Sequence, residues 1–220
     1  MKKGLTEIVF IIDRSGSMAG LEGDTIGGYN SLLRKQKAVE GEVIVSTVLF
    51  DDRCEVLHDR RAIQSIGEMT NDQYFVRGST ALLDAIGGAI HHIGNIHKYA
   101  REEDRPEKTL FVITTDGMEN SSRYYSFEKV KNMVERQKTK YGWEFLFLGA
   151  NIDAITTASR FGIQADRAVN YENDSEGTRL NYEVLSETVT CFRQSESPTS
   201  AIPVNWKNGI EADYAARHRR

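Results

Sequence analysis

Five oxygen-bearing side chains stand where the sequence indicates that a buried strand ends or a long helix begins. They are Asp13, Ser15, Ser17, Thr80 and Asp116. The first three follow one apolar run, Asp116 follows another, and Thr80 precedes the longest helical pattern. Oxygen ligands without nitrogen or sulfur suit a hard divalent cation, and Mg²⁺ takes about six of them in a near-octahedral arrangement. The sequence therefore predicts a metal site.

The charge of this set of residues matters as much as its geometry. Two aspartates balance a divalent ion, whereas hydroxyl groups add ligands without adding charge. The alternation in Asp13-x-Ser15-x-Ser17 lets a turning loop aim three side chains at one point, and Gly16 allows the turn to tighten. A metal held in this way can accept one more carboxylate from outside. Mg²⁺ is the expected ion, and Mn²⁺ and Ca²⁺ are also candidates because both accept oxygen ligands.

Strand and helix patterns alternate along the chain and would place these residues at one edge of a sheet. Strands are predicted at residues 8–12, 43–50, 54–57, 110–114 and 145–148, and around Val169. Helices are predicted at residues 25–39, 80–100, 127–141, 154–161 and 180–192. Strands that are apolar without alternation are buried on both faces, as in parallel sheets that helices cover.

These patterns predict the fold class. It is α/β, doubly wound and Rossmann-like, with a mostly parallel central sheet and helices on both faces. The tight turn at Asp51-Asp52 makes the strand after it an antiparallel edge strand. In such sheets ligands bind beyond the carboxyl ends of the strands, where the five oxygen side chains would meet.

The chain of 220 residues is long enough for one large domain with a full core. We expect one domain over residues 1–195. Residues 196–220 contain two of the three prolines and are expected to form a C-terminal extension, irregular or docked on the domain through Ile202 and Trp206.

Composition argues against nucleic acid and membrane as partners. The formal net charge of −4 is not that of a nucleic-acid-binding surface. No window approaches the roughly 18 apolar residues that a membrane-spanning helix needs, and Glu7 interrupts the apolar start that a secretory signal would require. Cys54 and Cys191 are expected to be free, partly buried thiols, which favours a reducing compartment, the cytoplasm.

The order Asp13-x-Ser15-x-Ser17, Gly78-Ser79-Thr80, Thr115-Asp116-Gly117 resembles the metal-ion-dependent adhesion site of von Willebrand factor type A domains, in particular stand-alone intracellular bacterial ones. The resemblance covers roughly residues 4–195. It implies that Ser15, Ser17 and Thr80 bind a metal through their hydroxyls and that Asp13 and Asp116 bind it directly or through water. It further implies that a Glu or Asp of a partner protein fills the sixth position, and that helices near the C-terminus shift when it does.

Other interpretations of the same residues remain open. Asp13, Ser17 and Thr80 could each cap a helix instead, or the motif could persist without affinity for metal. Arg14 is expected to point outward, where it could steer an acidic ligand.

Three functional classes follow from these interpretations. The first is a non-catalytic, metal-dependent protein-binding module. The second is a Mg²⁺-dependent phosphatase resembling the haloacid dehalogenases, in which Asp13 would be the nucleophile, although Ser15 stands where those enzymes have an acid. The third is a structural subunit of a larger complex in which the metal only stabilises the fold.

Overall fold

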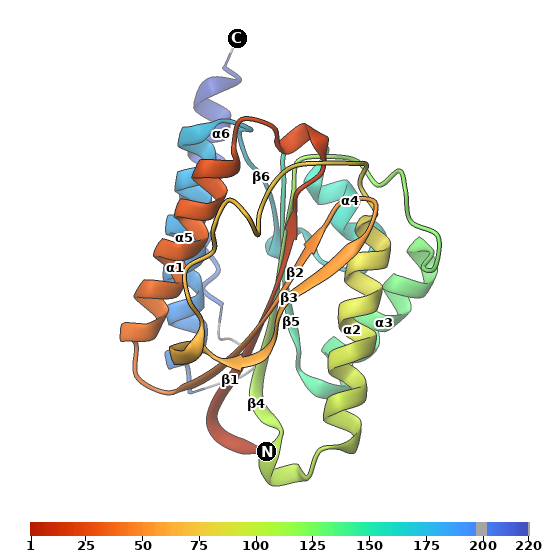
Figure 1. The fold of residues 1–220 in the computed structure, drawn as a ribbon, viewed down its shortest axis with the longest axis vertical. Coiled ribbons are helices and arrows are strands. Elements are labelled where there is room, and N and C mark those ends of the chain that lie inside the picture. Colours follow the sequence, from red (N-terminus) through yellow and green to blue (C-terminus); the bar gives the residue numbers. More distant parts are fainter. Residues whose placement is uncertain (197–201, 220) are drawn as a thin grey trace.

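A six-stranded sheet forms the centre of the computed structural model, which describes residues 1–196 and 202–219 (Figure 1). The strands are β1 (Lys2–Asp13), β2 (Glu42–Phe50), β3 (Cys54–Ala62), β4 (Pro106–Thr115), β5 (Glu144–Gly149) and β6 (Ala168–Asn170). Their order is β3-β2-β1-β4-β5-β6. Only the pairing of the edge strand β3 with β2 is antiparallel among these strands. The predicted fold class is confirmed.

Helices cover both faces of the sheet. One face carries α1 (Glu22–Ala38), α5 (Ser175–Gln194) and α6 (Asn208–Arg217), and the other carries α2 (Leu82–Tyr99), α3 (Phe127–Tyr141) and α4 (Ala154–Arg160) (Figure 1). Alternate residues of β1 belong to two separate cores: Phe10 packs with α1 and α5, whereas Ile11 packs with α2. Burial on both sides explains why the apolar runs show no alternation.

The helix ends agree with their sequence signals better than the strand ends do. Helix α3 spans the predicted residues, begins at the Ser126 cap and ends at Gly142, whose φ of 66° is the left-handed conformation that glycine favours. Strand β3 continues to Ala62, well beyond the predicted residues 54–57. Its second half is polar and mostly exposed because it lies at the sheet edge, so the apolar pattern stopped before the strand did.

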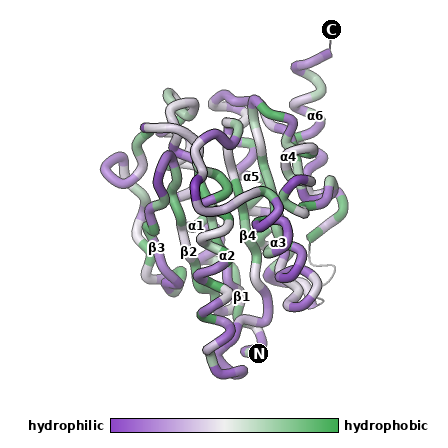
Figure 2. Tube along the Cα trace, turned by 90° about the vertical axis from the view of Figure 1, so that its right-hand side faces the viewer, coloured by the Kyte–Doolittle hydropathy of each residue, from purple (hydrophilic) through white to green (hydrophobic). Residues whose placement is uncertain are grey.

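Hydropathy follows the layered arrangement, with apolar stretches in the central strands and polar residues concentrated in the surrounding loops (Figure 2). Within the described residues, no helix combines the length and apolar character needed to cross a membrane. Cys54 and Cys191 are free but exposed, so the prediction of partly buried thiols is wrong.

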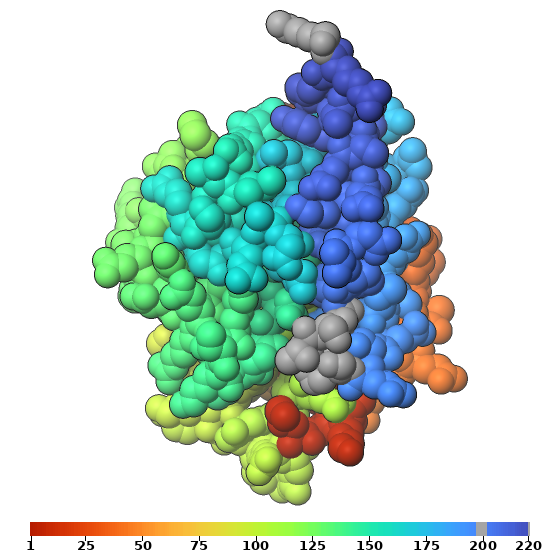
Figure 3. Space-filling view, turned by 180° about the vertical axis from the view of Figure 1, so that it is seen from behind, coloured from red at the N-terminus to blue at the C-terminus, as the bar shows by residue number. Residues whose placement is uncertain are grey.

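The C-terminal segment packs against the domain and is more regular than expected. Residues 208–217 form helix α6, where the sequence suggested irregular structure. Ile202 and Trp206, the two predicted docking residues, are buried, as is Ile210 of α6. Figure 3 shows this segment lying alongside α5. The helix was missed because Ile210 is its only buried residue, too weak a signal for a pattern of one apolar face.

Candidate metal centre

The five predicted side chains meet at the carboxyl edge of the sheet, beyond the ends of β1 and β4. The Ser15 and Ser17 hydroxyl oxygens are 3.2 Å apart, and the Ser17 hydroxyl donates to Asp116 Oδ1 at 2.5 Å. The backbone N–H of Ser15 donates to Asp13 Oδ1 at 2.7 Å, which folds the loop back on the end of β1. Strand register explains the meeting, because β1 and β4 are adjacent and parallel and end at the same level.

Gly117 brings Thr80 into the same group. A Cβ atom at Gly117 would lie 3.1 Å from the Thr80 Oγ1 atom and 3.3 Å from the Ser17 Oγ atom. The two hydroxyls therefore flank one bare backbone position directly after Asp116. Any larger residue at position 117 would crowd both of them, so the glycine keeps space open between the three loops.

Both aspartates are buried, and burial is the main cause of their shifted pKa values. Burial raises the pKa of Asp13 to about 6, although hydrogen bonds from Thr115 and Ser15 act in the opposite direction. Burial also raises the pKa of Asp116, against hydrogen bonds from Ser17 and Asn173. In the described part of the chain, no Lys, Arg or His side chain forms an ion pair with either carboxylate. Two buried carboxylates thus stand close together without a cationic partner.

Helix capping does not account for these residues. Helix α1 begins after Leu21, and α2 begins after Ala81, and neither N-terminus is capped by its N-cap side chain. Other side chains hold the start of α2: Glu119 Oε2 accepts from the Leu83 N–H at 2.8 Å, and Ser122 Oγ accepts from the Asp84 N–H at 3.0 Å. Thr80 is therefore not the N-cap that the sequence allowed.

The donor set fits a hard divalent cation. Nowhere in residues 1–196 and 202–219 do three His, Cys, Asp or Glu side chains gather as they would around a transition metal. The centre instead combines two carboxylates with three hydroxyl groups, all oxygen, which is the ligand type of Mg²⁺, Mn²⁺ and Ca²⁺. The open position at Gly117, the paired hydroxyls and the unbalanced negative charge are compatible with such an ion.

Arg14 does not point outward, contrary to the sequence-based expectation. Its side chain is fully buried, with Nε 2.8 Å from Asp51 Oδ2 and Nη2 2.8 Å from Glu55 Oε2. Arg77 Nε also lies 2.8 Å from Asp51 Oδ2. Asp51 therefore does more than form a turn: it is the buried centre of an ion cluster beside the candidate metal centre. Arg14 has its own carboxylate partners and is not available to steer a ligand.

Sequence reasoning missed one residue in contact with the centre. Asn173 lies between β6 and α5, and its Nδ2 atom donates to Asp116 Oδ2 at 3.1 Å. It stands 57 residues after Asp116 and is not part of the motif that resembles a metal-ion-dependent adhesion site. The only available signal was its place just beyond the weak strand predicted around Val169, at the same edge of the sheet.

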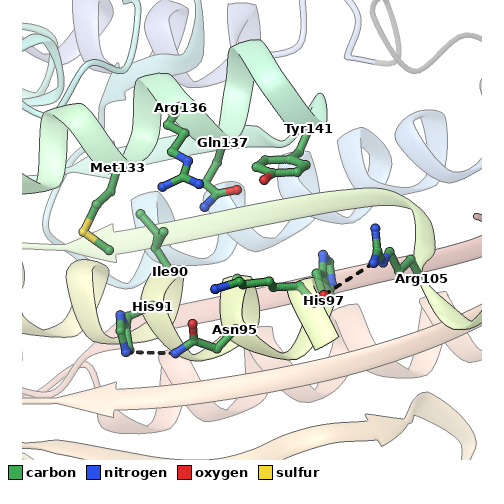
Figure 4. Close-up of a pocket in the computed structure, with 11 residues that line it drawn as sticks. Ile90, His91, Asn95, His97, Arg105, Met133, Arg136, Gln137 and Tyr141 are labelled. Atoms are coloured by element: carbon green, nitrogen blue, oxygen red, sulfur yellow. Dashed lines mark hydrogen bonds between the residues drawn. The ribbon is translucent and has the colours of Figure 1, made fainter. Parts of the chain in front are cut away.

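A cavity of about 450 Å³ lies between α2 and α3 at the opposite end of the sheet (Figure 4). Its lining includes Lys98, Arg105 and Arg136 but none of the five predicted residues. Arg105 donates to the carbonyl oxygen of Ala100 at the end of α2, and Lys98 lies in the last turn of that helix. Cations at helix C-termini offset the helix dipole, which accounts for Lys98 and Arg105 without a ligand.

No protein-family model matches the sequence, and no curated protein matches it significantly. Solved structures do match. One is proximal thread matrix protein 1 of the mussel byssus, in a form whose metal-ion-dependent adhesion site (MIDAS) motif is occupied by zinc. It is 14% identical, with a TM-score of 0.57, over 85% of this chain and 46% of the mussel chain. Manganese-loaded TRAP protein of Plasmodium vivax is 15% identical with a TM-score of 0.55 over 82% and 72%.

A von Willebrand factor type A structure from Catenulispora acidiphila is 12% identical with a TM-score of 0.54 over 84% of this chain and 42% of that one. The chain spans less than half the length of the mussel and Catenulispora proteins that it matches. At these identities the likeness concerns the fold alone. The chain has the von Willebrand factor type A fold.

Proposed function

We propose that the chain is a metal-dependent protein-binding module. Asp13, Ser15, Ser17, Thr80 and Asp116 would hold a divalent cation, with Mg²⁺ as the expected ion and Mn²⁺ or Ca²⁺ as substitutes. When bound, the ion supplies a positive, electrophilic centre to which an Asp or Glu of a partner protein can bind. The observation that carries this proposal is the pair of buried aspartates that lack a cationic partner among the described residues.

The roles of the residues follow from their contacts. Ser17 donates to Asp116 and Thr115 donates to Asp13, so the two carboxylates are held before any ion arrives. Gly117 leaves space between the Ser17 and Thr80 hydroxyls. The two aspartates balance the charge of a divalent ion, and the hydroxyls add ligands without adding charge, so the ion would stay electrophilic and could accept an additional acidic ligand. Two of the structural neighbours carry a metal, the mussel protein zinc at its MIDAS motif and the Plasmodium protein manganese, which supports metal binding here.

The proposed role is binding without catalysis, with no catalytic residue. The haloacid-dehalogenase interpretation has no support from the structural neighbours, and Ser15 cannot act as the acid that such enzymes place two residues after the nucleophile. The proposed location is the cytoplasm, on the ground that both cysteines are free.

The test is protein capture from a lysate of the source organism in Mg²⁺ or in EDTA, with the wild type and Asp116→Ala as baits. We expect a partner that the wild type retains only in Mg²⁺ and that Asp116→Ala does not retain. Replacing the interfacial Asp or Glu of that partner with Ala should abolish retention. If Mg²⁺ raises the melting temperature but the same partner binds in EDTA, the domain is a structural subunit and the proposal is wrong.

A further inference from the structure

Asn173 fixes the orientation of a carboxylate of the candidate metal centre. Asp116 accepts the Ser17 hydroxyl at Oδ1 and the Asn173 amide at Oδ2, 2.5 and 3.1 Å away. One donor comes from the loop after β1 and the other from the loop after β6, so each oxygen of the carboxylate is held by a different loop. Without Asn173, the Asp116 carboxylate would be free to turn about its contact with Ser17.

The other end of the Asn173 side chain is an acceptor without a donor. Its Oδ1 atom is buried and has no hydrogen-bond partner among the residues that the structure describes. Buried acceptors are nearly always paired with a protein group or with water. A hydrated divalent cation beside Asp116 would bring O–H donors to this position, since Mg²⁺ usually keeps several of its waters. The orphaned oxygen is therefore compatible with a hydrated ion held by the five proposed ligands.

The loop that carries Asn173 is tightly folded. Asp174, the next residue, caps α5 by accepting the Gly177 N–H at 2.7 Å. A Cβ atom at Gly177 would lie 2.1 Å from the carbonyl oxygen of Glu172, so the turn leaves no space for a side chain there. The position of Asn173 is thus determined by its neighbours on both sides.

Helix α6 holds this loop from outside. Arg217 Nη1 lies 2.5 Å from Asp174 Oδ2, and Arg217 Nη2 lies 3.0 Å from Glu176 Oε2. These ion pairs lie at the surface: the side chains of Arg217, Asp174 and Glu176 are 25%, 46% and 68% exposed. Asp174 therefore uses one oxygen to start α5 and the other to bind α6.

The C-terminal segment also holds the beginning of β6. Trp206 Nε1 donates to the carbonyl of Asp166 at 2.8 Å, and Lys207 Nζ donates to the carbonyls of Ala165 and Ala168. One segment therefore contacts the chain just before β6 and just after it. Contacts of Trp206 and Lys207 therefore lie at the beginning of β6, and contacts of Arg217 lie beyond the Asn173 loop.

We propose that Asn173 is a positioning residue of the metal centre and that Arg217 of α6 maintains its position, so that the C-terminal segment sets the metal affinity. This inference rests on the proposed function. It gives the extension a role that the five-residue motif does not contain.

The test measures Mn²⁺ affinity by calorimetry in the full-length chain. Asn173→Ala should weaken binding about 10- to 100-fold, as removal of groups that orient metal ligands commonly does. Arg217→Gln should weaken it about threefold to tenfold. Arg179→Gln is the matched control: it breaks a surface ion pair on α5, between Arg179 and Glu183 at 2.9 Å, and should leave the affinity within twofold.

A double variant distinguishes positioning from general destabilisation. If Arg217 acts through Asn173, then Arg217→Gln should have no further effect in an Asn173→Ala background, because contacts in one chain of interactions are not additive. Additive losses, or an Arg217→Gln protein with lower melting temperature but unchanged Mn²⁺ affinity, would overturn the coupling. If the wild type binds Mn²⁺ and Asn173→Ala binds it equally well, the inference about Asn173 fails alone. If the wild type binds no divalent ion, the proposed function fails with it.

Discussion

Two buried aspartates stand at the ends of adjacent strands, and they have opposite surroundings. Asp13 ends β1, and Asp51 follows β2, directly after the residue paired with Asp13. Asp51 is bound by Arg14 and Arg77, both 2.8 Å away. Asp13 accepts hydrogen bonds from neutral donors, the Ser15 N–H and the Thr115 hydroxyl, and has no cationic partner among the described residues. The two sites are equally inaccessible and differ in whether the protein supplies a cation.

The pKa values follow this difference. Burial would raise the pKa of Asp51, but hydrogen bonds from Arg77, the Arg53 N–H and Arg14 outweigh it, and the net pKa is lowered. For Asp13 burial prevails over the hydrogen bonds from Thr115 and Ser15, and the pKa rises to about 6. Arg14 directly follows Asp13 in the chain, yet its side chain neutralises Asp51 on the neighbouring strand's loop and not Asp13. The fold thus supplies cations to Asp51 from its own chain, whereas under the proposed function Asp13 receives its cation from outside.

Removal of Arg14, the buried cation that binds Asp51, should have the largest effect on stability. Arg14→Met keeps much of the apolar volume of the side chain. It leaves the buried Asp51 with one cationic partner, Arg77, whose side chain is partly exposed to solvent. Breaking a buried ion pair from one side costs about 3–5 kcal/mol. We expect the free energy of unfolding, measured in urea, to fall by that amount. Arg53→Met, at an exposed position of the same loop, should change it by less than about 0.5 kcal/mol. A similar small loss in Arg14→Met would remove the distinction between the two aspartates.

The contributions of Asp13 and Asp51 to stability should depend on pH with opposite signs. Its folded pKa of about 6 lies above the ordinary 3.8, so the ionised carboxylate destabilises the metal-free fold above pH 6. Stability is regained as pH falls from 6 towards 4, by about 3 kcal/mol at most. Asp51, whose pKa is lowered, contributes stability that is lost only below that window.

The measurement compares the wild type with Asp13→Asn in EDTA at pH 7 and pH 4.5. Asn retains an acceptor for the Ser15 N–H and carries no charge, so the variant should be more stable at pH 7 and lose this advantage at pH 4.5. A variant that is less stable at both pH values would show that the Asp13 charge supports the metal-free fold.

Sequence patterns located the candidate centre because its residues obey a local rule. Each follows a buried strand or precedes a long helix, and parallel strands bring those positions to one edge. The same rule applied to Asp51, which directly follows β2, would have placed it there too. Its importance was hidden because a turn also explained it, and its two cationic partners, Arg14 and Arg77, come from other segments of the chain.

Long-range contacts explain the other differences. The burial of Arg14 depends on Asp51 and Glu55 and leaves no trace in the residues next to it. Asn173 reaches the centre because the loop after β6 contacts Asp116, which follows β4, two strands away in the sheet, and the sequence of a three-residue strand does not reveal this contact. Helix α6 is held by ion pairs and one apolar residue, so the apolar periodicity that predicts helices did not mark it.

Removal of one hydroxyl ligand tests the external-cation site without affecting the charge balance. Thr80→Val preserves the shape of a buried side chain and removes the oxygen. We expect Mg²⁺ and Mn²⁺ affinities, measured by titration calorimetry, to fall about tenfold or more, or roughly 1.4 kcal/mol. Because no hydrogen bond of the Thr80 hydroxyl occurs within the described structure, metal-free stability should change little. Thr80→Ser should retain the affinity, and equal binding by Thr80→Val and the wild type would exclude Thr80 from the centre.

The smallest effect should come from filling the space between the Ser17 and Thr80 hydroxyls. In Gly117→Ala the new methyl group would lie 3.1 Å from Thr80 Oγ1, closer than ordinary van der Waals contact, so Thr80 and Ser17 must move by a few tenths of an ångström. Metal affinity should fall about threefold, or about 0.7 kcal/mol, with metal-free stability nearly unchanged. Gly67→Ala is the control, because a Cβ atom there meets nothing within 4 Å. If Gly117→Ala instead lowers metal-free stability by as much as Arg14→Met, the edge beside Asp13 is packed as tightly as the ion cluster around Asp51, and the contrast between a completed and an open site does not hold.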